Sequence, residues 1–483
     1  MASTYKEPSA VLKRLFLPPK DPSLTLSSDY QWLVITQEPP LPTIEQLAKP
    51  EEKLAGIRFD PALFTPSRLD YATSLVLQHM ATGEQQSIEL PSNSEGIRYI
   101  RFHPSKPYFV FTCKVKDETL LELYKCELID IDGTQQWVVE KVSLGEKRRM
   151  NFVYGCAYQF TSDGEKLLVK VIPENWPVEP PKEPVSTGPA IQMVAKDARK
   201  APGRTYQDLL KNEYDEAKLK HFLSTELLCI TTSTLDVKLI QQSKGGCLIR
   251  SLQPSPCGNF VLVQLTTQFS YSVPMSRFGK DVQIWSLEEK KSSSGDQNDV
   301  VVEVASLPVD DEIPLSYDAC SRHPRSFHFH PCHDHTVVYV QALDGGESLS
   351  EPFEGDRDAM YTRPLDATTM TLASPTKFAG LEWRYSDLDF CESGLGIIEE
   401  YRWKDRMERK WILETDGAKR LLWQRSWEDR YTAPGEPLTR RGARGRYFIV
   451  QPSPTSIYLQ GSGASALGDR PFLDRLDFGE GGK

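Results

Sequence analysis

LIRSLQPSPCGNFVLVQL, residues 248–265, contains the pattern that decides the fold. A segment that alternates apolar and polar residues leads into a turn rich in Pro, Ser and Gly, and a run of β-branched and aromatic residues follows. Alternation predicts a strand with one buried face, and a continuous apolar run predicts a strand buried on both faces. We therefore predict a strand–turn–strand unit whose second strand begins at Phe260.

The same pattern recurs along the chain. The further copies are LTLSSDYQWLVIT (24–36), YIRFHPSKPYFVFTC (99–113), CAYQFTSDGEKLLVKV (156–171), SFHFHPCHDHTVVYV (326–340), YSDLDFCESGLGIIEEY (385–401) and LTRRGARGRYFIVQ (438–451). Their second strands are expected to begin at Trp32, Tyr108, Lys166, Thr336, Leu395 and Tyr447. Each gap between these positions exceeds the ~40–50 residues that a four-stranded propeller blade needs. The pattern predicts an all-β fold, a seven-bladed β-propeller, whereas two stacked β-sandwich domains would leave the repeated turn unexplained.

Two insertions interrupt the repeats, near 43–70 and 173–225, within a propeller domain expected over 1–475. The first insertion contains a helical stretch. The second begins with the Pro-rich PENWPVEPPKEPVSTGPAIQ (173–192), which predicts an extended loop. It continues into RTYQDLLKNEYDEAKLKHFL (204–223), where apolar residues recur at near-helical spacing and Thr205 is a candidate N-cap.

Composition narrows the class of protein. The chain has 483 residues, 39% of them hydrophobic, and a formal net charge of −10, which argues against nucleic acid or an anionic membrane as the main partner. The nine cysteines include no CxxC pair, a pattern typical of free thiols in a reducing compartment. The N-terminal stretch has no continuous apolar region, and its acidic residues disfavour a transit peptide. We expect a soluble intracellular protein.

RHPRSFHFHPCHDHTVVYV (322–340) holds five of the eight histidines. A metal site would use His328 and His330, which share one strand face, together with His333, His335 or Cys332 from the turn. Our interpretation is instead a structural hairpin with strands at 326–330 and 336–340. It places Phe327 and Phe329 on the face opposite His328 and His330, in the register of the other copies. No cofactor is expected.

A second candidate site is the basic, aromatic stretch from Arg402 to Arg446. It holds 13 Lys or Arg, 7 Asp or Glu and four tryptophans. Aromatic residues between cations can stack on single-stranded nucleic acid. Because the segments W-I-L-E-T and K-R-L-L-W resemble strands, we expect their tryptophans to pack between blades and we expect no nucleic-acid partner. DGGES (344–348) predicts a glycine turn.

Several long segments resemble plant and algal chloroplast-type glutamyl endopeptidases, a branch of the prolyl oligopeptidase family. They are LAKPEEKLAGIRFDP (47–61), GPAIQ (188–192), RTYQDLLKNEYDE (204–216), YSVPMSRFGKDVQIW (271–285) and GSGASALGDRPFLD (461–474). The resemblance implies a propeller of about seven blades, followed in the family by an α/β-hydrolase domain with a Ser–Asp–His triad. The family cleaves peptides after glutamate, and its propeller limits access to the catalytic cleft.

The catalytic part of the family has no counterpart here. No GxSxG nucleophile elbow occurs, and the last histidine is His335, whereas the hydrolase triad runs Ser, acid, His. Residues 476–483 are expected to be a truncated tail where the hydrolase domain would begin. No catalytic residue is assigned, and the chain alone is expected not to hydrolyse peptides. The resemblance therefore implies the non-catalytic, substrate-gating propeller of a serine-type endopeptidase; a stand-alone scaffold for protein–protein interaction is the alternative.

MSRFGKDV (275–282) places Arg277 and Lys280 near the start of a strand. In an enzyme that prefers glutamate, these cations could attract the substrate carboxylate, although a loop at the outer rim would carry such residues equally well. The expected partners are peptide substrates or a separate α/β-hydrolase domain, with a protein partner on a propeller face as the alternative, and no membrane. The resemblance suggests the chloroplast, while the missing transit pattern leaves the cytoplasm open.

Overall fold

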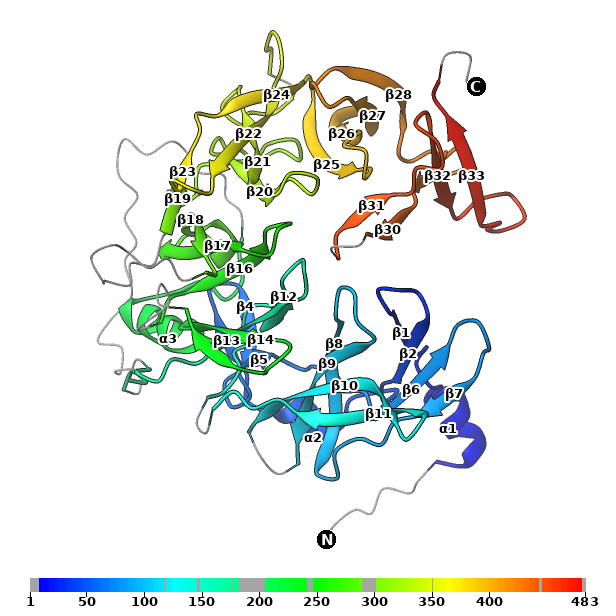
Figure 1. The fold of residues 1–483 in the computed structure, drawn as a ribbon. Coiled ribbons are helices and arrows are strands. Elements are labelled where there is room, and N and C mark those ends of the chain that lie inside the picture. Colours follow the sequence, from blue (N-terminus) through cyan, green and yellow to red (C-terminus); the bar gives the residue numbers. More distant parts are fainter. Residues whose placement is uncertain are drawn as a thin grey trace. The chain divides into compact units, whose positions relative to one another are not determined.

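The computed structural model describes residues 8–116, 119–145, 148–176, 178–181, 205–240, 246–288, 301–349, 351–442 and 445–479. These residues form two compact units. Unit 1 comprises 1–160, 164–179 and 217–247, and unit 2 comprises 161–163, 180–216 and 248–483. Both units consist mainly of antiparallel sheets whose strands follow one another in chain order (Figure 1).

Unit 1 contains three four-stranded sheets. The first is β1 (Ser23–Leu26), β2 (Trp32–Gln37), β6 (Ser74–His79) and β7 (Gln85–Ser87). The second is β8 (Ser94–Phe102), β9 (Tyr108–Val115), β10 (Leu121–Ile131) and β11 (Thr134–Lys141). The third is β12 (Tyr158–Phe160), β13 (Lys166–Val171), β14 (Glu226–Thr231) and β15 (Val237–Leu239). A short helix, α1 (Ala10–Phe16), precedes them.

The 43–70 insertion of unit 1 contains the predicted helical stretch. Helix α2 (Ile44–Ala48) begins with a capping box, in which Thr43 accepts from the backbone of Gln46 and the Gln46 side chain bonds back to Thr43. A small sheet follows, made of β3 (Glu52–Leu54), β4 (Ile57–Asp60) and β5 (Thr65–Pro66).

Strand β9 shows why the apolar runs are continuous. Phe109 and Phe111 belong to the core shared with the first sheet, whereas Tyr108 and Val110 belong to the core shared with the third sheet. Because successive side chains of a strand point to opposite faces, a sheet covered on both sides needs apolar residues at every position. The prediction of second strands buried on both faces is confirmed here.

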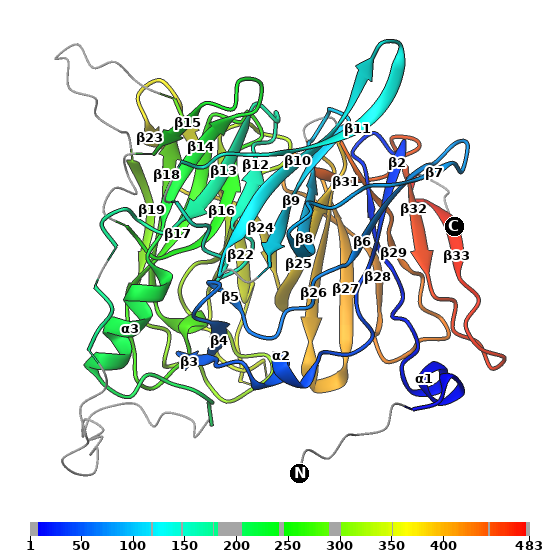
Figure 2. The same ribbon diagram turned by 90° about the horizontal axis from the view of Figure 1, so that it is seen from below.

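Unit 2 continues the series (Figure 2). The fourth sheet is β16 (Ile249–Pro254), β17 (Phe260–Gln268), β18 (Gly279–Ser286) and β19 (Val301–Leu307). The fifth is β20 (Arg325–Phe329), β21 (Thr336–Ala342) and β22 (Asp358–Asp366), with β23 (Thr371–Leu372) and β24 (Thr376–Leu381) both pairing with β22. The sixth is β25 (Arg384–Phe390), β26 (Gly396–Arg402), β27 (Met407–Leu413) and β28 (Lys419–Ser426).

The C-terminal strands of unit 2 form two smaller sheets. One contains β29 (Glu436–Pro437), β32 (Ser456–Gly461) and β33 (Phe472–Asp477), and the other is the hairpin of β30 (Thr439–Arg441) and β31 (Tyr447–Ile449). Apolar clusters join the fourth sheet to the fifth, the fifth to the sixth and the sixth to these strands. Successive meander sheets that share cores are consistent with a propeller-like all-β fold.

Most second strands begin where the sequence predicts. Trp32, Tyr108, Lys166, Phe260 and Thr336 are the first residues of β2, β9, β13, β17 and β21, and Leu395 precedes β26 by one residue. Tyr447 differs, because it begins a strand of the separate β30–β31 hairpin instead of the second strand of a four-stranded sheet.

The predicted helix in 204–223 is shorter than its apolar spacing suggests. Helix α3 runs from Glu213 to Leu223, and Asn212 supplies the cap by accepting a hydrogen bond from the Asp215 amide at 3.0 Å. Thr205 therefore lies outside the helix and is not its N-cap. Residues 177 and 182–192 of the Pro-rich stretch lie outside the described residues. Of the helices described, none has the length and apolar content needed to cross a bilayer.

Candidate functional site

Arg277 and Lys280 lie close to a third cation, Arg250. Arg277 ends a short 3₁₀ turn before β18, and its guanidinium lies 5.7 Å from the centre of the Tyr206 ring. Arg250, on β16, donates to the backbone carbonyl of Ser276 at 3.0 Å. Burial lowers the pKa of Lys280, and the charge of Arg250 lowers it further. The structure thus brings two predicted residues and one residue that the sequence reasoning missed to the start of the same strand.

We call Arg250, Arg277 and Lys280 the cationic cluster. Carboxylates compensate its positive charge only in part. Asp310 opposes the fall in the pKa of Lys280, and its amide donates to the Arg277 carbonyl at 2.9 Å. Within the described ranges, however, none of the three cations has a carboxylate oxygen within 4.0 Å. Half-buried cations without a close counter-ion favour binding of an anion, and arginine binds carboxylates in a bidentate manner.

The histidine stretch forms the predicted strand–turn–strand in β20 and β21, and both Phe327 and Phe329 are buried. The His330 ring lies 4.3 Å from the His333 ring and 4.2 Å from the Phe390 ring. The Cys332 amide donates to Nδ1 of His330 at 3.2 Å.

Four of the five histidines have such contacts, and the absence of a metal at this stretch stays a prediction. Burial lowers the pKa of His330 to about 3, and neighbouring histidines add to this effect. His328 donates from Nδ1 to the Ser326 carbonyl at 2.8 Å, and the His335 ring packs edge-on against Phe260. Among the described residues, no three His, Cys, Asp or Glu side chains gather in a way that could hold a metal ion.

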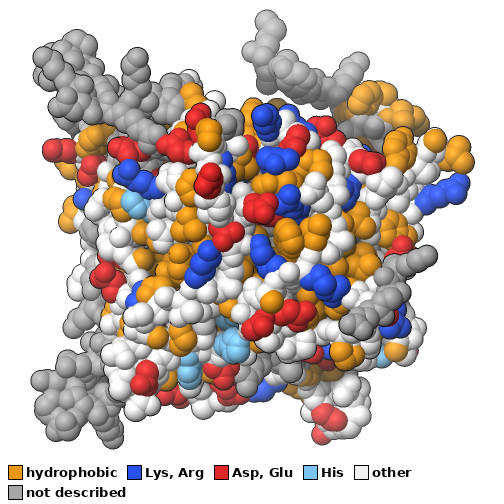
Figure 3. Space-filling view, turned by 90° about the horizontal axis from the view of Figure 1, so that it is seen from above, with side chains coloured by type: hydrophobic (Ala, Val, Ile, Leu, Met, Phe, Trp, Pro, Cys, Tyr) orange, Lys and Arg blue, Asp and Glu red, His pale blue; other side chains and the backbone are white. Residues whose placement is uncertain are grey.

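The tryptophans of the basic stretch have partners within unit 2. Trp403 stacks on Tyr317 with ring centres 4.5 Å apart, and Trp411 donates from Nε1 to Glu400 at 3.0 Å. Lys410 forms ion pairs with Glu399 and Glu436. On the face drawn in Figure 3, positive and negative side chains are interspersed among hydrophobic ones. That no nucleic acid binds here stays a prediction.

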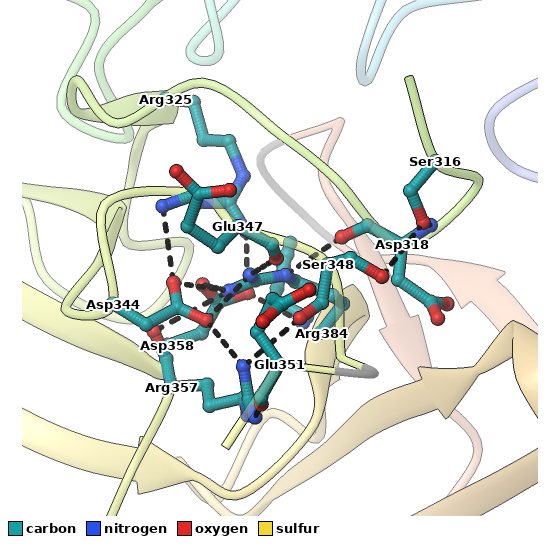
Figure 4. A network of polar contacts seen from close by, with 12 residues as sticks. Ser316, Asp318, Arg325, Asp344, Glu347, Ser348, Glu351, Arg357, Asp358 and Arg384 are labelled. Atoms are coloured by element: carbon teal, nitrogen blue, oxygen red, sulfur yellow. Dashed lines mark hydrogen bonds and ion pairs between the residues drawn. The ribbon is translucent and has the colours of Figure 1, made fainter. Parts of the chain in front are cut away.

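A network of buried ion pairs joins the fifth sheet to the sixth. Arg384, the first residue of β25, is 1% exposed and donates to Asp344 at 2.7 Å and to Asp358 at 3.1 Å. Arg357 pairs with Asp344 at 2.9 Å, and Arg325 pairs with Asp358. Figure 4 shows these side chains converging from the starts of β20, β22 and β25 and from the loop after β21. Removing one partner of such a network would leave a buried charge uncompensated.

The network also shapes the loop between β21 and β22. Arg384 donates to the carbonyls of Glu347 and Asp318, and Arg357 donates to those of Ser348 and Glu351. The predicted glycine turn is present, since the amide of Gly346 donates to Asp344 at 3.0 Å and its φ is +77°. Buried guanidinium groups thus hold the backbone of this loop at several points.

Sequence reasoning missed this network. Asp344, Asp358 and Arg384 come from three separate segments and share no motif. A weak signal was present, because Asp358 and Arg384 each stand at the start of a strand that buries apolar side chains, where a charged residue at the edge of the core needs a partner.

Comparisons with known proteins agree with the resemblance that the sequence segments indicate. No family model matches the chain. The probable chloroplastic glutamyl endopeptidase of Oryza sativa subsp. japonica is 28% identical over 499 residues, covering 99% of this chain and 50% of that protein. The protein of the same name from Arabidopsis thaliana is 26% identical over 494 residues, covering 99% of this chain and 49% of that protein. The chain therefore resembles chloroplastic glutamyl endopeptidases along nearly all of its length, in a way that fits their propeller portion, and it spans about half the length of these relatives.

Solved structures with a similar chain trace include two other kinds of enzyme. An acylaminoacyl peptidase of Pyrococcus horikoshii matches with a TM-score of 0.38 and 9% identity, over 96% of this chain and 52% of that chain. An oligogalacturonate lyase of Vibrio parahaemolyticus matches with a TM-score of 0.37 and 12% identity, over 97% of this chain and 100% of that chain.

Proposed function

We propose that this chain acts as the non-catalytic β-propeller of a glutamyl-endopeptidase-like serine peptidase. The observation that carries this proposal is the match along 99% of the chain to proteins of that name, of which it spans about half. The pairing of the strands supports it, because every sheet of the described residues is antiparallel, whereas an α/β-hydrolase is built on a mainly parallel sheet.

In this proposal the two units are parts of one ring over residues 1–475. The six meander sheets are six blades, and the β29–β32–β33 sheet together with the β30–β31 hairpin provides the seventh. Within each unit, the apolar cores that successive sheets share support this assignment, because blades stack face to face around a ring. The ring would admit short or unfolded peptides and exclude folded proteins by size. The relatives' names include the word chloroplastic, and we extend that compartment to this chain as part of the proposal.

The cationic cluster would add selectivity to this gate. Arg250, Arg277 and Lys280 would attract the carboxylate of a glutamate side chain, since no close carboxylate within the described part of the chain compensates them. The ligand class follows from the charge of the site, and the choice of glutamate follows from the relatives' name.

The absence of catalysis by the chain itself is directly testable. The purified chain is incubated with a fluorogenic peptide that contains glutamate and with a fluorophosphonate probe, which labels activated serines. We expect neither hydrolysis nor labelling, because no GxSxG elbow is present. Stoichiometric labelling of any serine would refute a non-catalytic role.

A stand-alone scaffold is the second candidate. The observation in its favour is the exposed Tyr317, 73% accessible, which stacks on Trp403 beside Trp427. Tyrosine and tryptophan are enriched at the centres of protein interfaces. The transcript beyond the codon for Lys483 separates the two candidates: an open frame that encodes a GxSxG elbow favours the peptidase, and its absence favours the scaffold.

A further inference from the structure

Unit 2 contains a pocket of about 390 Å³ beside the buried network, a volume within the usual range for small-molecule sites. Its walls include Phe353 and Asp356 from the loop before β22, Arg357 from the residue before that strand, Glu382 and Trp383 from the β24–β25 turn, and Arg402 from the end of β26. The segments quoted above for the peptidase resemblance contain none of these residues, and neither does the cationic cluster.

Ion pairs, a hydrogen bond and cation–π contacts fix the side chains that line the pocket. Arg357 is fixed by Asp344 and by the Ser348 carbonyl, and the same Asp344 is fixed by Arg384. The Trp383 ring is covered by the guanidinium groups of Arg402 at 4.2 Å and Arg409 at 3.8 Å. A site whose walls are already ordered loses little conformational entropy when a ligand binds.

Each charged group of the wall already has a counter-ion within the protein. Arg357 pairs with Asp344 at 2.9 Å and Arg402 pairs with Asp405 at 2.6 Å. Glu382 pairs with Arg409 at 2.8 Å and Asp356 pairs with Lys377 at 2.7 Å. A ligand with a net charge therefore meets no unmatched charge in this pocket and would lose its hydration without compensation.

The same groups still offer hydrogen bonds. Arg402 uses Nε and Nη2 for Asp405, so its Nη1 is free to donate. Glu382 and Asp356 each use one carboxylate oxygen for their ion pair, so the other oxygen can accept. The pocket therefore presents donors and acceptors together.

One wall of the pocket is apolar. The Phe353 side chain is 41% exposed, and the Arg357 guanidinium lies 5.4 Å from the centre of its ring. Exposed aromatic surface at the mouth of a polar pocket gains stability when a flat apolar face covers it.

We propose that this pocket binds a neutral saccharide. A sugar ring carries no charge, its hydroxyl groups donate and accept at once, and its C–H face can pack on Phe353 while the hydroxyls meet Arg402, Asp356 and Glu382. A ligand with a carboxylate would bind at the cationic cluster instead. This inference does not rest on the proposed gating role, because none of its residues belongs to the cationic cluster.

Isothermal titration of the intact chain tests the proposal. The ligands are the neutral disaccharides maltose, cellobiose and lactose, with glutamate as a charged comparison. We expect at least one disaccharide to bind with a Kd in the millimolar range, and Phe353→Ala and Glu382→Gln each to weaken that binding about tenfold. Tyr431→Ala, which removes an aromatic side chain that is 72% exposed and does not line the pocket, should bind as the wild type does.

Three results would overturn the proposal. They are no heat from any neutral disaccharide at tens of millimolar, equal binding by the wild type and both pocket variants, or tighter binding of glutamate than of the disaccharides with the same dependence on Phe353. Circular dichroism of the variants checks that each is folded. Since Glu382 is on the surface, its variant keeps the test valid if Phe353→Ala does not fold.

Discussion

The cationic cluster and the pocket beside Arg357 are both rich in arginine, yet their charges are arranged in opposite ways. In the cationic cluster, no described carboxylate lies within ion-pair distance of Arg250, Arg277 or Lys280. In the pocket, Arg357 and Arg402 each hold a carboxylate of the protein itself. In the two proposals above, the local pairing of charges, and not the number of arginines, decides whether a site selects an anion or a neutral ligand.

The largest expected effect concerns the network behind the pocket. Arg384→Ala would leave Asp344 and Asp358 buried with one cation fewer, so the free energy of unfolding should fall by roughly 3–5 kcal/mol. Urea unfolding followed by circular dichroism measures the change. Arg440→Ala, which breaks an exposed pair with Glu392, is the matched control and should cost no more than ~1 kcal/mol. Equal losses for the two variants would contradict a structural role for the network.

A smaller effect is expected at the cationic cluster. Binding of a glutamate-containing peptide to the chain should weaken about tenfold in Arg277→Ala, a change of ~1.4 kcal/mol, because one charged donor is lost. The same peptide with glutamine in place of glutamate is the control and should bind equally to both proteins. Fluorescence anisotropy gives both affinities. An unchanged preference for glutamate in the variant would remove Arg277 from the site.

The salt concentration should affect ligand binding differently at the cationic cluster and at the pocket. Raising the NaCl concentration from 50 to 500 mM should weaken binding of the glutamate peptide several-fold, because Debye screening acts on a half-buried cationic site that has no described carboxylate within 4.0 Å. Binding of a neutral disaccharide to the pocket should stay constant over the same range. If salt weakens binding of the disaccharide, or leaves binding of the peptide unchanged, the charges of the two sites are not paired as described.

The smallest expected effect is a loss of stability in acid. Burial by itself would raise the pKa of the Asp344 carboxyl, but hydrogen bonds from Arg384 and Arg357 outweigh burial and hold this pKa below its usual range. A carboxyl with a lowered pKa in the folded state stabilises the protein above its unfolded pKa and loses that contribution as pH falls through the folded value. The urea concentration at the unfolding midpoint should therefore decrease once the pH falls below about 4. The decrease should be smaller in Asp344→Asn. If the urea midpoints of the two proteins decrease in parallel as the pH falls, Asp344 does not cause the loss of stability in acid.

The fold was more predictable from the sequence than the sites. Alternation and turn residues located β2, β9, β13, β17 and β21, because strand periodicity is local. The β30–β31 hairpin shows the same local pattern, which is why it was counted as a repeat. Helix α3 began later than predicted because Asn212, and not Thr205, supplies its cap.

The sites depend on residues that only the tertiary structure brings together. Arg277 and Lys280 are close in sequence and could be predicted as a pair, but Arg250 joins them only through the pairing of β16, β17 and β18. Asp344, Asp358 and Arg384 likewise meet because β22 and β25 start beside the same loop. No spacing rule within one segment reports such contacts.

A crystal structure of the 483-residue chain would show directly whether the two units belong to one propeller. We expect units 1 and 2 to close into one ring of seven blades, with the β29–β32–β33 sheet and the β30–β31 hairpin as the seventh. Two separate β domains, or a ring closed by a different number of sheets, would contradict it.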